Sequence, residues 1–328
     1  MSNRRSDYDI TNTVQVSDPA AVATAVVGLY KDLYEHQNSD LIERAFSEFA
    51  LIFRGEHPDY HGCETTYHDL QHSLDVTLTM SRLIHGHESG HAKTERLGPE
   101  RALVGLITAL YHDVGYIRSI DDKQHRDGAE YTRTHVSRSG LFLEDYLPRL
   151  NLGHTAKIAS TIVHFTGYEV PLDQIRVNDP KYIKLGHLLG TADMLAQMSD
   201  RCYLEKCRDR LYNEFVLGGV ARQKTADGEL IVIYKSPEHL LEKTPGFVTA
   251  TLTSRLGRAF NNAYRYAEVF FGGRNPYMEQ IDRHMRHLEY ILETDSWHLL
   301  RRKPPCYNVE YFRGEAGLDD TTPPTIPS

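Results

Sequence analysis

The chain has few cysteines, and their spacing argues against thiolate-based architectures. The four are Cys63, Cys202, Cys207 and Cys306, and no two form a Cys-x-x-Cys pair. Cys202 and Cys207 are five residues apart, a poor fit to one face of a helix. We therefore expect no disulfide framework and no zinc–thiolate site, and we interpret the thiols as reduced, in a cytoplasmic protein.

An excess of basic residues and long apolar runs are missing too. The 37 Lys and Arg residues are outnumbered by 45 Asp and Glu residues, giving a formal net charge of −8. Such a chain argues against an extended nucleic-acid surface, although a bound cation would still admit a small anionic substrate. The longest nearly apolar run, 102–110, falls well short of the ~20 residues that span a bilayer. The polar segment 1–18 has no apolar signal core, so we expect no membrane segment.

What is present is typical of one large helical domain. Hydrophobic residues make up 40% of the 328 positions and charged residues 25%, as in ordinary soluble globular proteins. Apolar residues recur at helical spacing, so we predict an all-α fold with a single domain over 18–302. A flexible arm, 1–17, would precede it, and a proline-rich disordered tail, 303–328, would follow. Apolar runs on either side of an Asp-Gly pair predict a β-hairpin insertion at about 220–235.

Several helix starts carry a proline directly after a capping residue. A side chain that accepts a backbone N–H, followed by proline at the first helical position, is a strong start signal. Pairs of this kind, or with glycine before the proline, are Asp18-Pro19, Gly98-Pro99, Asp179-Pro180 and Asn275-Pro276.

Chemistry-bearing residues first gather on a predicted helix that begins near Thr66. His68 and His72 are four residues apart, so both imidazoles leave the same side of this helix, about 5–6 Å apart at Cβ. Two such rings can bind a metal, or one can bind while the other handles a proton. Two surface histidines are the alternative in a chain with 18 histidines. The polar run 85–94 is expected to end the helix and to carry solvated loop histidines.

Two further segments place carboxylates among apolar residues. His112 and Asp113 follow the run 102–110, which is apolar enough for a fully buried helix, and Asp193 lies among small and apolar residues. An unpartnered buried carboxylate is costly, so the His-Asp pair calls for a cation. Helical folds build metal sites from inward-facing residues of this kind on separate helices. Mixed imidazole and carboxylate ligands suit one or two ions of Mg, Mn, Fe, Co, Ni or Zn without choosing among them.

The order of these motifs resembles the HD-domain superfamily of metal-dependent phosphohydrolases. Tyr-His-x-x-x-His-x-x-Asp-Val at 67–76, His-Asp-Val at 112–114 and Thr-Ala-Asp at 191–193 are similar to motifs of cyclic nucleotide phosphodiesterase catalytic domains. The resemblance covers about residues 60–215. It implies an HD-domain or phosphodiesterase-like helical bundle.

The resemblance also implies roles for individual residues. His72, His112, Asp113 and Asp193 would bind the tightly held metal, and Asp113 would bridge to a second one. His68 would be the general acid that protonates the leaving oxygen.

Some positions depart from the phosphodiesterase pattern. Tyr116 stands where a further histidine usually follows the His-Asp pair, and neither the Glu-Asn-His segment nor a purine-binding glutamine has a match. Other branches of the superfamily supply extra histidines, for which His135 and His164 are the candidates. The alternatives are a histidine on a surface helix for His135 and one that only contacts a metal-bound water for His164.

Further residues are assigned roles around the site. Arg118 is a candidate for binding the substrate phosphate, and Tyr67 for lining the pocket. Asp75 is either a hydrogen-bond acceptor for a ligand imidazole or an exposed carboxylate.

Three hypotheses about function follow. The first is a phosphohydrolase that cleaves a small nucleotide-like phosphoester with metal-activated water and His68 as acid, a cyclic nucleotide being one candidate substrate. The second is an HD-domain di-iron oxygenase, which would need His135 and His164 as ligands. The third is a nucleotide-binding regulatory module without turnover, in which the hairpin and the last helix serve a partner or a homodimer.

Overall fold

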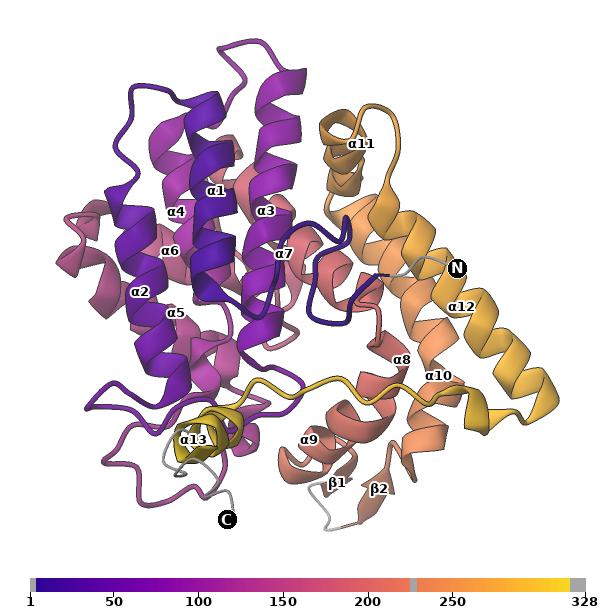
Figure 1. Ribbon diagram of the computed structural model, residues 1–328. Coiled ribbons are helices and arrows are strands. Elements are labelled where there is room, and N and C mark those ends of the chain that lie inside the picture. Colours follow the sequence, from indigo (N-terminus) through magenta and orange to yellow (C-terminus); the bar gives the residue numbers. More distant parts are fainter. Residues whose placement is uncertain (1–3, 225–228, 319–328) are drawn as a thin grey trace, which may run out of the picture.

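The computed structural model describes residues 4–224 and 229–318, and these residues are mostly helical (Figure 1). The α-helices up to residue 199 are α1 (Pro19–Leu33), α2 (Asp40–Arg54), α3 (Leu70–Gly90), α4 (Pro99–Leu110), α5 (His135–Arg149), α6 (Ala156–Ile162) and α7 (Pro180–Ser199). Those after residue 199 are α8 (Tyr203–Lys206), α9 (Tyr212–Leu217), α10 (Pro237–Ala250), α11 (Tyr266–Phe270), α12 (Pro276–Thr294) and α13 (Val309–Leu318). The predicted all-α fold with a small hairpin is confirmed.

Helix α3 is the centre of the molecule. Its residues from Leu70 to Ile84 are buried on all sides, and it packs against α1, α4, α7 and α11. Helix α4 is buried from Ala102 to Leu110, as its apolar composition predicts. Because α3, α4 and α7 pack against one another, residues at their ends meet in the core.

The proline signals mark the helix starts correctly. Helices α1, α4, α7 and α12 each have a proline at the first helical turn. Before three of them, the side chains of Asp18, Asp179 and Asn275 accept a backbone N–H. Four predicted boundaries are therefore confirmed.

The start predicted for α3 is wrong, whereas its end falls within the predicted run 85–94. Asp69, not Thr66, is the N-cap, because its carboxylate accepts the backbone N–H of His72 at 3.1 Å. The helix also continues to Gly90, so the predicted loop of histidines is partly helical. His87 is buried there, and its Nδ1 lies 3.0 Å from the Glu88 carboxylate.

The N-terminal arm, predicted to be flexible, packs against the domain over its described residues, 4–17. Asp9 is fully buried and forms an ion pair with Arg82 of α3 at 2.6 Å. Its carboxylate also accepts N–H groups of Thr13 and Val14 at 2.8 and 2.9 Å. Polar composition alone predicted exposure, whereas here the polar groups satisfy one another in the interior.

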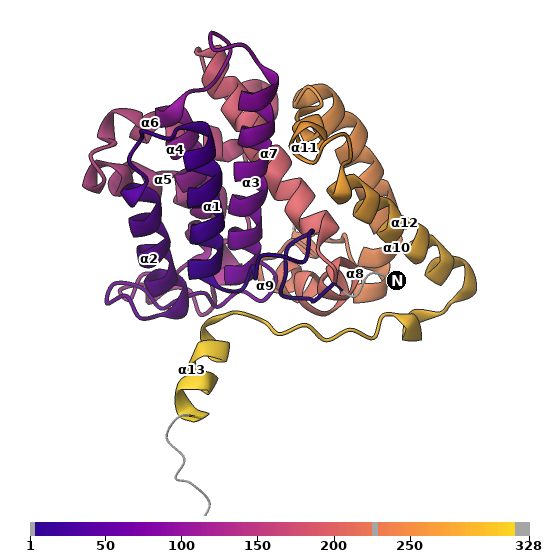
Figure 2. The ribbon, with the colours of Figure 1, turned by 45° about the horizontal axis from the view of Figure 1, so that its top comes forward.

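The C-terminal tail is ordered through residue 318, contrary to the prediction of disorder from 303. We call residues 300–309 the C-terminal strap; it runs along one face of the molecule and leads into α13 (Figure 2). Arg210 donates to the carbonyl of Pro305 at 2.9 Å, and the Val309 N–H donates to the carbonyl of Cys63 at 2.7 Å. Prolines lack an N–H but keep an acceptor, so a proline-rich segment can still be held by donors of the domain.

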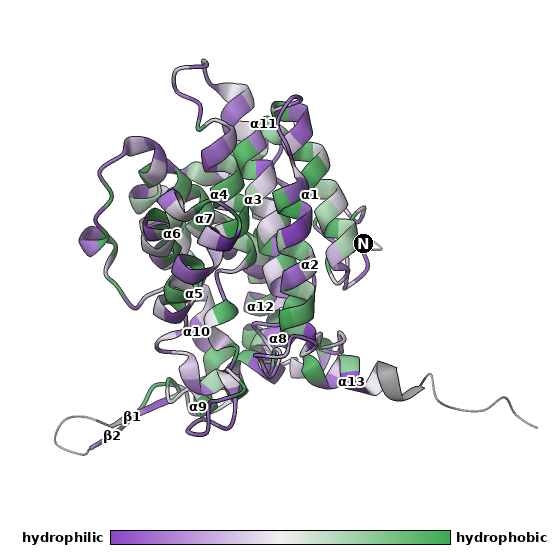
Figure 3. Cartoon of the chain, turned by 90° about the vertical axis from the view of Figure 1, so that its left-hand side faces the viewer, coloured by the Kyte–Doolittle hydropathy of each residue, from purple (hydrophilic) through white to green (hydrophobic). Residues whose placement is uncertain are grey.

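The hairpin consists of β1 (Arg222–Lys224) and β2 (Leu230–Val232), which pair antiparallel and extend away from the helices (Figure 3). The predicted Asp227-Gly228 turn lies outside the described residues. All four cysteines are free, as expected. In 4–224 and 229–318 no helix is both long and apolar enough to cross a membrane.

Candidate metal centre

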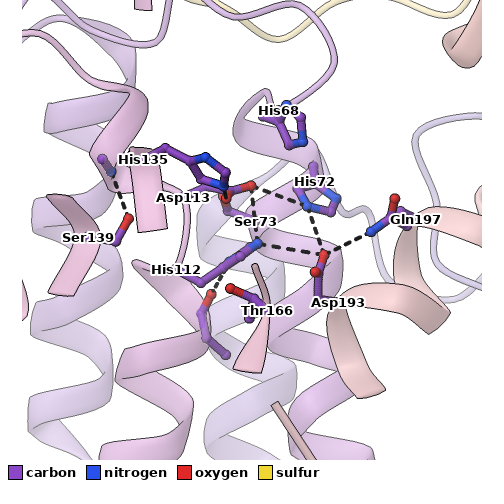
Figure 4. Close-up of polar contacts among 12 residues, drawn as sticks. His68, His72, Ser73, His112, Asp113, His135, Ser139, Thr166, Asp193 and Gln197 are labelled. Carbon is purple, nitrogen blue, oxygen red and sulfur yellow. Dashed lines mark hydrogen bonds and ion pairs between the residues drawn. The ribbon is translucent and has the colours of Figure 1, made fainter. Parts of the chain in front are cut away.

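Four predicted ligands from three core segments converge on one point (Figure 4). His72 Nε2 lies 3.4 Å from Asp113 Oδ2 and 3.4 Å from Asp193 Oδ1. His112 Nε2 lies 3.1 Å from Asp113 Oδ2 and 3.8 Å from Asp193 Oδ1. Nitrogen and oxygen ligands about 2.0–2.2 Å from a shared ion lie about 3.0–3.5 Å from one another, so most of these spacings suit a single cation.

The facing atoms of His112 and Asp113 are poorly matched without a cation. His112 Nδ1 donates to the Ala109 carbonyl at 2.8 Å, near the end of α4. In the neutral ring this bond leaves a lone pair on Nε2, aimed at the carboxylate. His112 Nε2 and Asp113 Oδ2 are both buried and have no hydrogen-bond partner among the described residues. Two buried acceptors in contact are costly, and a shared metal ion would satisfy both. His72, His112 and Asp113 can thus hold a metal ion.

The electrostatics of the cluster favour positive charge. Burial opposes charge on His72, but the carboxylates of Asp113 and Asp193 outweigh it and raise the pKa of His72 to about 10. Burial likewise opposes charge on Asp113, yet the neighbouring His112 and His72 hold the pKa of Asp113 well below its ordinary value. The field that favours a proton here would equally favour a metal cation, which would take the proton's place.

His68, the predicted acid, lies beside the cluster and is held by Glu214. Its Nδ1 lies 2.6 Å from a Glu214 oxygen, and its ring stacks on Tyr116 with centroids 4.8 Å apart. Burial alone would lower the pKa of His68, but the Glu214 carboxylate raises it above the ordinary value. His68 is therefore held in one orientation, and its surroundings favour the protonated ring that the predicted general acid needs.

Besides His68, the structure brings His135 to the four ligands. Its Nδ1 donates to the Thr132 carbonyl at 2.9 Å, and its Nε2 lies 3.5 Å from Asp113 Oδ1. Burial lowers the pKa of His135, so the ring is neutral and its Nε2 can act as a ligand. Asp113 thus presents one oxygen to His72 and His112 and the other to His135.

A glycine makes this approach possible. A Cβ at Gly115 would lie 1.8 Å from the carbonyl oxygen of His135. Only glycine fits where η1 (Val114–Tyr116), just after Asp113, touches the start of α5.

Two predicted site residues lie elsewhere. His164 is partly buried, and its Nδ1 has no hydrogen-bond partner among the described residues. Burial lowers the pKa of His164 despite the nearby Glu169 carboxylate, and His164 is not among the residues that line the cavity of the metal centre. Arg118 binds Glu64 through two bonds of 2.7 and 2.6 Å, and so serves the loop packing rather than the centre.

Tyr67 lines the same cavity as the metal centre, as predicted. Its hydroxyl donates to Gln197 at 3.4 Å, and Gln197 in turn donates to Asp193 at 3.2 Å. The Tyr67 ring thus continues the wall of the site away from the ligands.

Asp69 and Glu214 are the residues that sequence reasoning missed. Glu214 accepts the backbone N–H of His68 at 3.3 Å as well as its ring, from 146 residues away. Asp69 caps α3 and also accepts the Tyr307 N–H of the strap at 2.9 Å. Asp69 falls within the first motif, and its spacing to His72 is an N-cap signal. No local sequence pattern identifies Glu214 as a site residue, because a single carboxylate on a charged helix is usually exposed to solvent.

The centre opens into a cavity of about 590 Å³. His68, Asp113, His135 and Asp193 line it, together with side chains from the region of α8, α9, the hairpin and α10. A volume of this size accommodates a ligand of the dimensions of a nucleotide or a drug.

Comparisons with known proteins give a family but no characterised relative. No curated protein and no solved structure matches the chain. Residues 34–275, well over half of the chain and including every proposed ligand, match the family model described as Npun_R2479-like. The chain is therefore a member of the Npun_R2479-like family.

Proposed function

We propose that this protein is a metal-dependent phosphohydrolase that cleaves a phosphoester bond in a small nucleotide-like substrate. The observation that carries the proposal is the pair of buried acceptors on His112 and Asp113 that have no hydrogen-bond partner among the described residues. His72 and Asp193 complete this set of ligands, and His68, which is held by Glu214, lines the same cavity. This combination supplies both requirements of phosphoester cleavage, a cation site and a proton donor. The resemblance to HD-domain phosphohydrolases motivates the reaction class.

The reaction would divide between the ion and the chain. His72, His112, Asp113 and Asp193 would hold a divalent cation, which when bound would neutralise phosphoryl charge and lower the pKa of water. His68 donates a proton to the leaving oxygen, and Glu214 fixes the donor nitrogen by holding Nδ1. Tyr116, whose ring stacks on both His68 and His135, helps to keep the two imidazoles in their orientation.

The shared Asp113 carboxylate supports a second cation at the same site. Asp113 Oδ1 and His135 Nε2 face each other at 3.5 Å on the side away from His112. A di-iron oxygenase also has a dinuclear site. That hypothesis needs His164 as a ligand, and His164 is not among the residues that line the cavity. The acid-like environment of His68 favours hydrolysis over oxygen chemistry, and it also favours turnover over a purely regulatory module.

The test is metal analysis beside hydrolysis assays with a panel of phosphoesters in Mn, Mg, Fe and Ni. His112→Ala should lose metal and activity together. His68→Ala should keep the metal and lose about 10²–10⁴ in rate. His85→Ala, outside the cavity lining, is the matched control and should change neither. A fully active His112→Ala would refute the proposal, and oxygen consumption with iron but no hydrolysis would favour the oxygenase.

A further inference from the structure

The cavity continues outward from the metal centre along an aromatic wall. Beyond the ligands and His68, rings from several elements line it: Tyr168, Tyr203, Phe215, Tyr234 and Phe247. Phe215 of α9 and Tyr234, just after β2, stack with centroids 5.7 Å apart. Aliphatic side chains of Met194, Leu211 and Leu240 fill the spaces between the rings. This outer part of the cavity therefore offers large, flat aromatic surfaces.

Two π-helical turns form the support for this wall. The first, η6 (Cys207–Leu211), contributes Cys207 and Leu211 to the cavity. The second, η7 (Thr251–Ala259), lies at a smaller cavity of about 310 Å³ that shares Tyr168 and Phe247 with the first. Single π turns are frequent at functional sites, because they displace side chains from the regular helical positions. Tyr168 and Phe247 stand at the junction and are partly open to solvent.

Charge in the cavity suits one phosphate. The carboxylates that line it belong to Asp113, Glu169 and Asp193, against two cationic side chains, Arg133 and Lys243. Both cations are exposed, and Arg133 already donates to the Gly219 carbonyl. A divalent ion at the centre would nearly balance the acids. Away from the centre, a second or third phosphate would face only the exposed Arg133 and Lys243 among the cations of the described lining, and its burial would be costly.

We propose that the substrate carries a single phosphate attached to a bulky aromatic or apolar body, which packs against the wall of Tyr168, Tyr203, Phe215, Tyr234 and Phe247. This inference rests on the proposed function for the position of the phosphate. It narrows the substrate class, because it disfavours nucleoside polyphosphates and small polar sugar phosphates alike. Aromatic side chains provide large contact areas for flat groups.

The test is calorimetric binding of phosphonates that cannot be hydrolysed at a phosphoester bond, with the full chain in Mn²⁺. Naphthylphosphonate should bind at least tenfold more tightly than methylphosphonate, because it buries apolar area against the wall. As a second comparison, adenosine 5′-diphosphate should bind no more tightly than adenosine 5′-monophosphate, which has the same body with one phosphate fewer.

Variants of the wall locate the effect. Phe247→Ala and Tyr234→Ala should each weaken naphthylphosphonate binding about fivefold or more, and leave methylphosphonate unchanged. Tyr290→Ala removes a ring that is 55% exposed on α12, outside the cavity lining, and should change neither affinity.

Each outcome separates this inference from the proposed function. Equal affinity for the two phosphonates, tighter binding of the diphosphate, or no phosphonate binding at all would overturn the inference. Failure of every hydrolysis assay, with the aromatic preference and its loss in Phe247→Ala intact, would count against the proposed function alone.

Discussion

At the residue scale, the properties of each histidine at the centre depend on the group that its Nδ1 contacts, because that contact decides where Nε2 points. His112 and His135 both use Nδ1 to bind a nearby backbone carbonyl, which directs Nε2 to Asp113. His68 uses Nδ1 differently, on the Glu214 carboxylate, and this partner favours the protonated ring. In the proposed mechanism, the same side-chain type therefore serves as a metal ligand or as an acid, depending on the group that Nδ1 contacts.

Glu214 should therefore set the alkaline limb of the activity profile. A general acid works in its protonated form, so activity should fall as pH rises through the pKa of His68, which lies above its ordinary 6.5. Glu214→Gln keeps an acceptor but removes the charge, so the alkaline limb should move to lower pH. The measurement is kcat/KM against pH, with metal content expected to stay unchanged. Glu238→Gln, an exposed carboxylate on α10, is the control; an unmoved limb in Glu214→Gln would contradict the role of His68.

Asp75 carries a second pH dependence, on stability. Its side chain is buried, Oδ1 has no hydrogen-bond partner among the described residues, and burial raises its pKa to about 7. The structure thus supports neither expectation from the sequence, an exposed carboxylate or an acceptor for a ligand imidazole. Because the folded pKa lies above the unfolded one, Asp75 favours folding at low pH, and this contribution is lost as pH rises through about 7.

Asp75→Asn should remove this loss. We expect the variant to be more stable than the wild type by about 2 kcal/mol at pH 8 and nearly equal to it at pH 4. Urea unfolding at the two pH values measures the difference. A variant that is equally destabilised at both would show that the carboxylate has a partner that asparagine cannot replace.

At the element scale, the start of α3 is completed by the strap. The Leu70 N–H donates to the Tyr307 carbonyl at 3.3 Å, and the Tyr307 N–H donates to Asp69. Arg210 holds the strap through the Pro304 and Pro305 carbonyls and lies 3.6 Å from Asp69. The helix that carries His72 is therefore capped partly by residues more than 230 positions away in sequence.

Arg210→Met should loosen this arrangement, since methionine keeps the apolar stem but removes every donor. We expect a loss of about 1–3 kcal/mol in unfolding free energy and faster hydrogen exchange at the amides of the strap. Arg301→Met, an exposed strap residue, should change neither. Exchange at 304–309 as slow as in the wild type would show that Arg210 does not hold the strap.

At the scale of the whole molecule, the sequence predicted what periodicity and local spacing encode. The all-α fold and the proline-marked starts of α1, α4, α7 and α12 were predicted correctly, and so was the hairpin. The convergence of His72, His112, Asp113 and Asp193 was also predicted. Each of those side chains lies in an apolar or motif-bearing stretch, where its burial can be read locally.

What could not be predicted depends on contacts between distant residues. Polar composition suggested a flexible arm and a disordered tail. In the structure, Asp9 forms an ion pair with Arg82, and Arg210 donates hydrogen bonds to the strap. Glu214 was overlooked because its partner is His68, far along the chain. Arg118 was predicted to bind the substrate phosphate, because no sequence pattern indicates that it pairs with Glu64, 54 residues away.

A bound ion should stabilise the entire fold, because three segments of the core provide its ligands. Any ligand that binds only the folded state adds about 2.7 kcal/mol at a concentration of 100 Kd. We expect Mn²⁺ or Fe²⁺ to raise the melting temperature by a few degrees and a chelator to reverse the rise. His112→Ala should show no such rise. An unchanged melting temperature of the wild type with every metal of the panel would contradict the site.

The order in which the strap and the ligands appear along the chain has a consequence for biosynthesis. All four ligands have left the ribosome well before Tyr307 is added, so a nascent chain already carries them while α3 still lacks part of its cap. The start of α3, which carries His72, would then reach its final hydrogen bonding only after the strap has been synthesised.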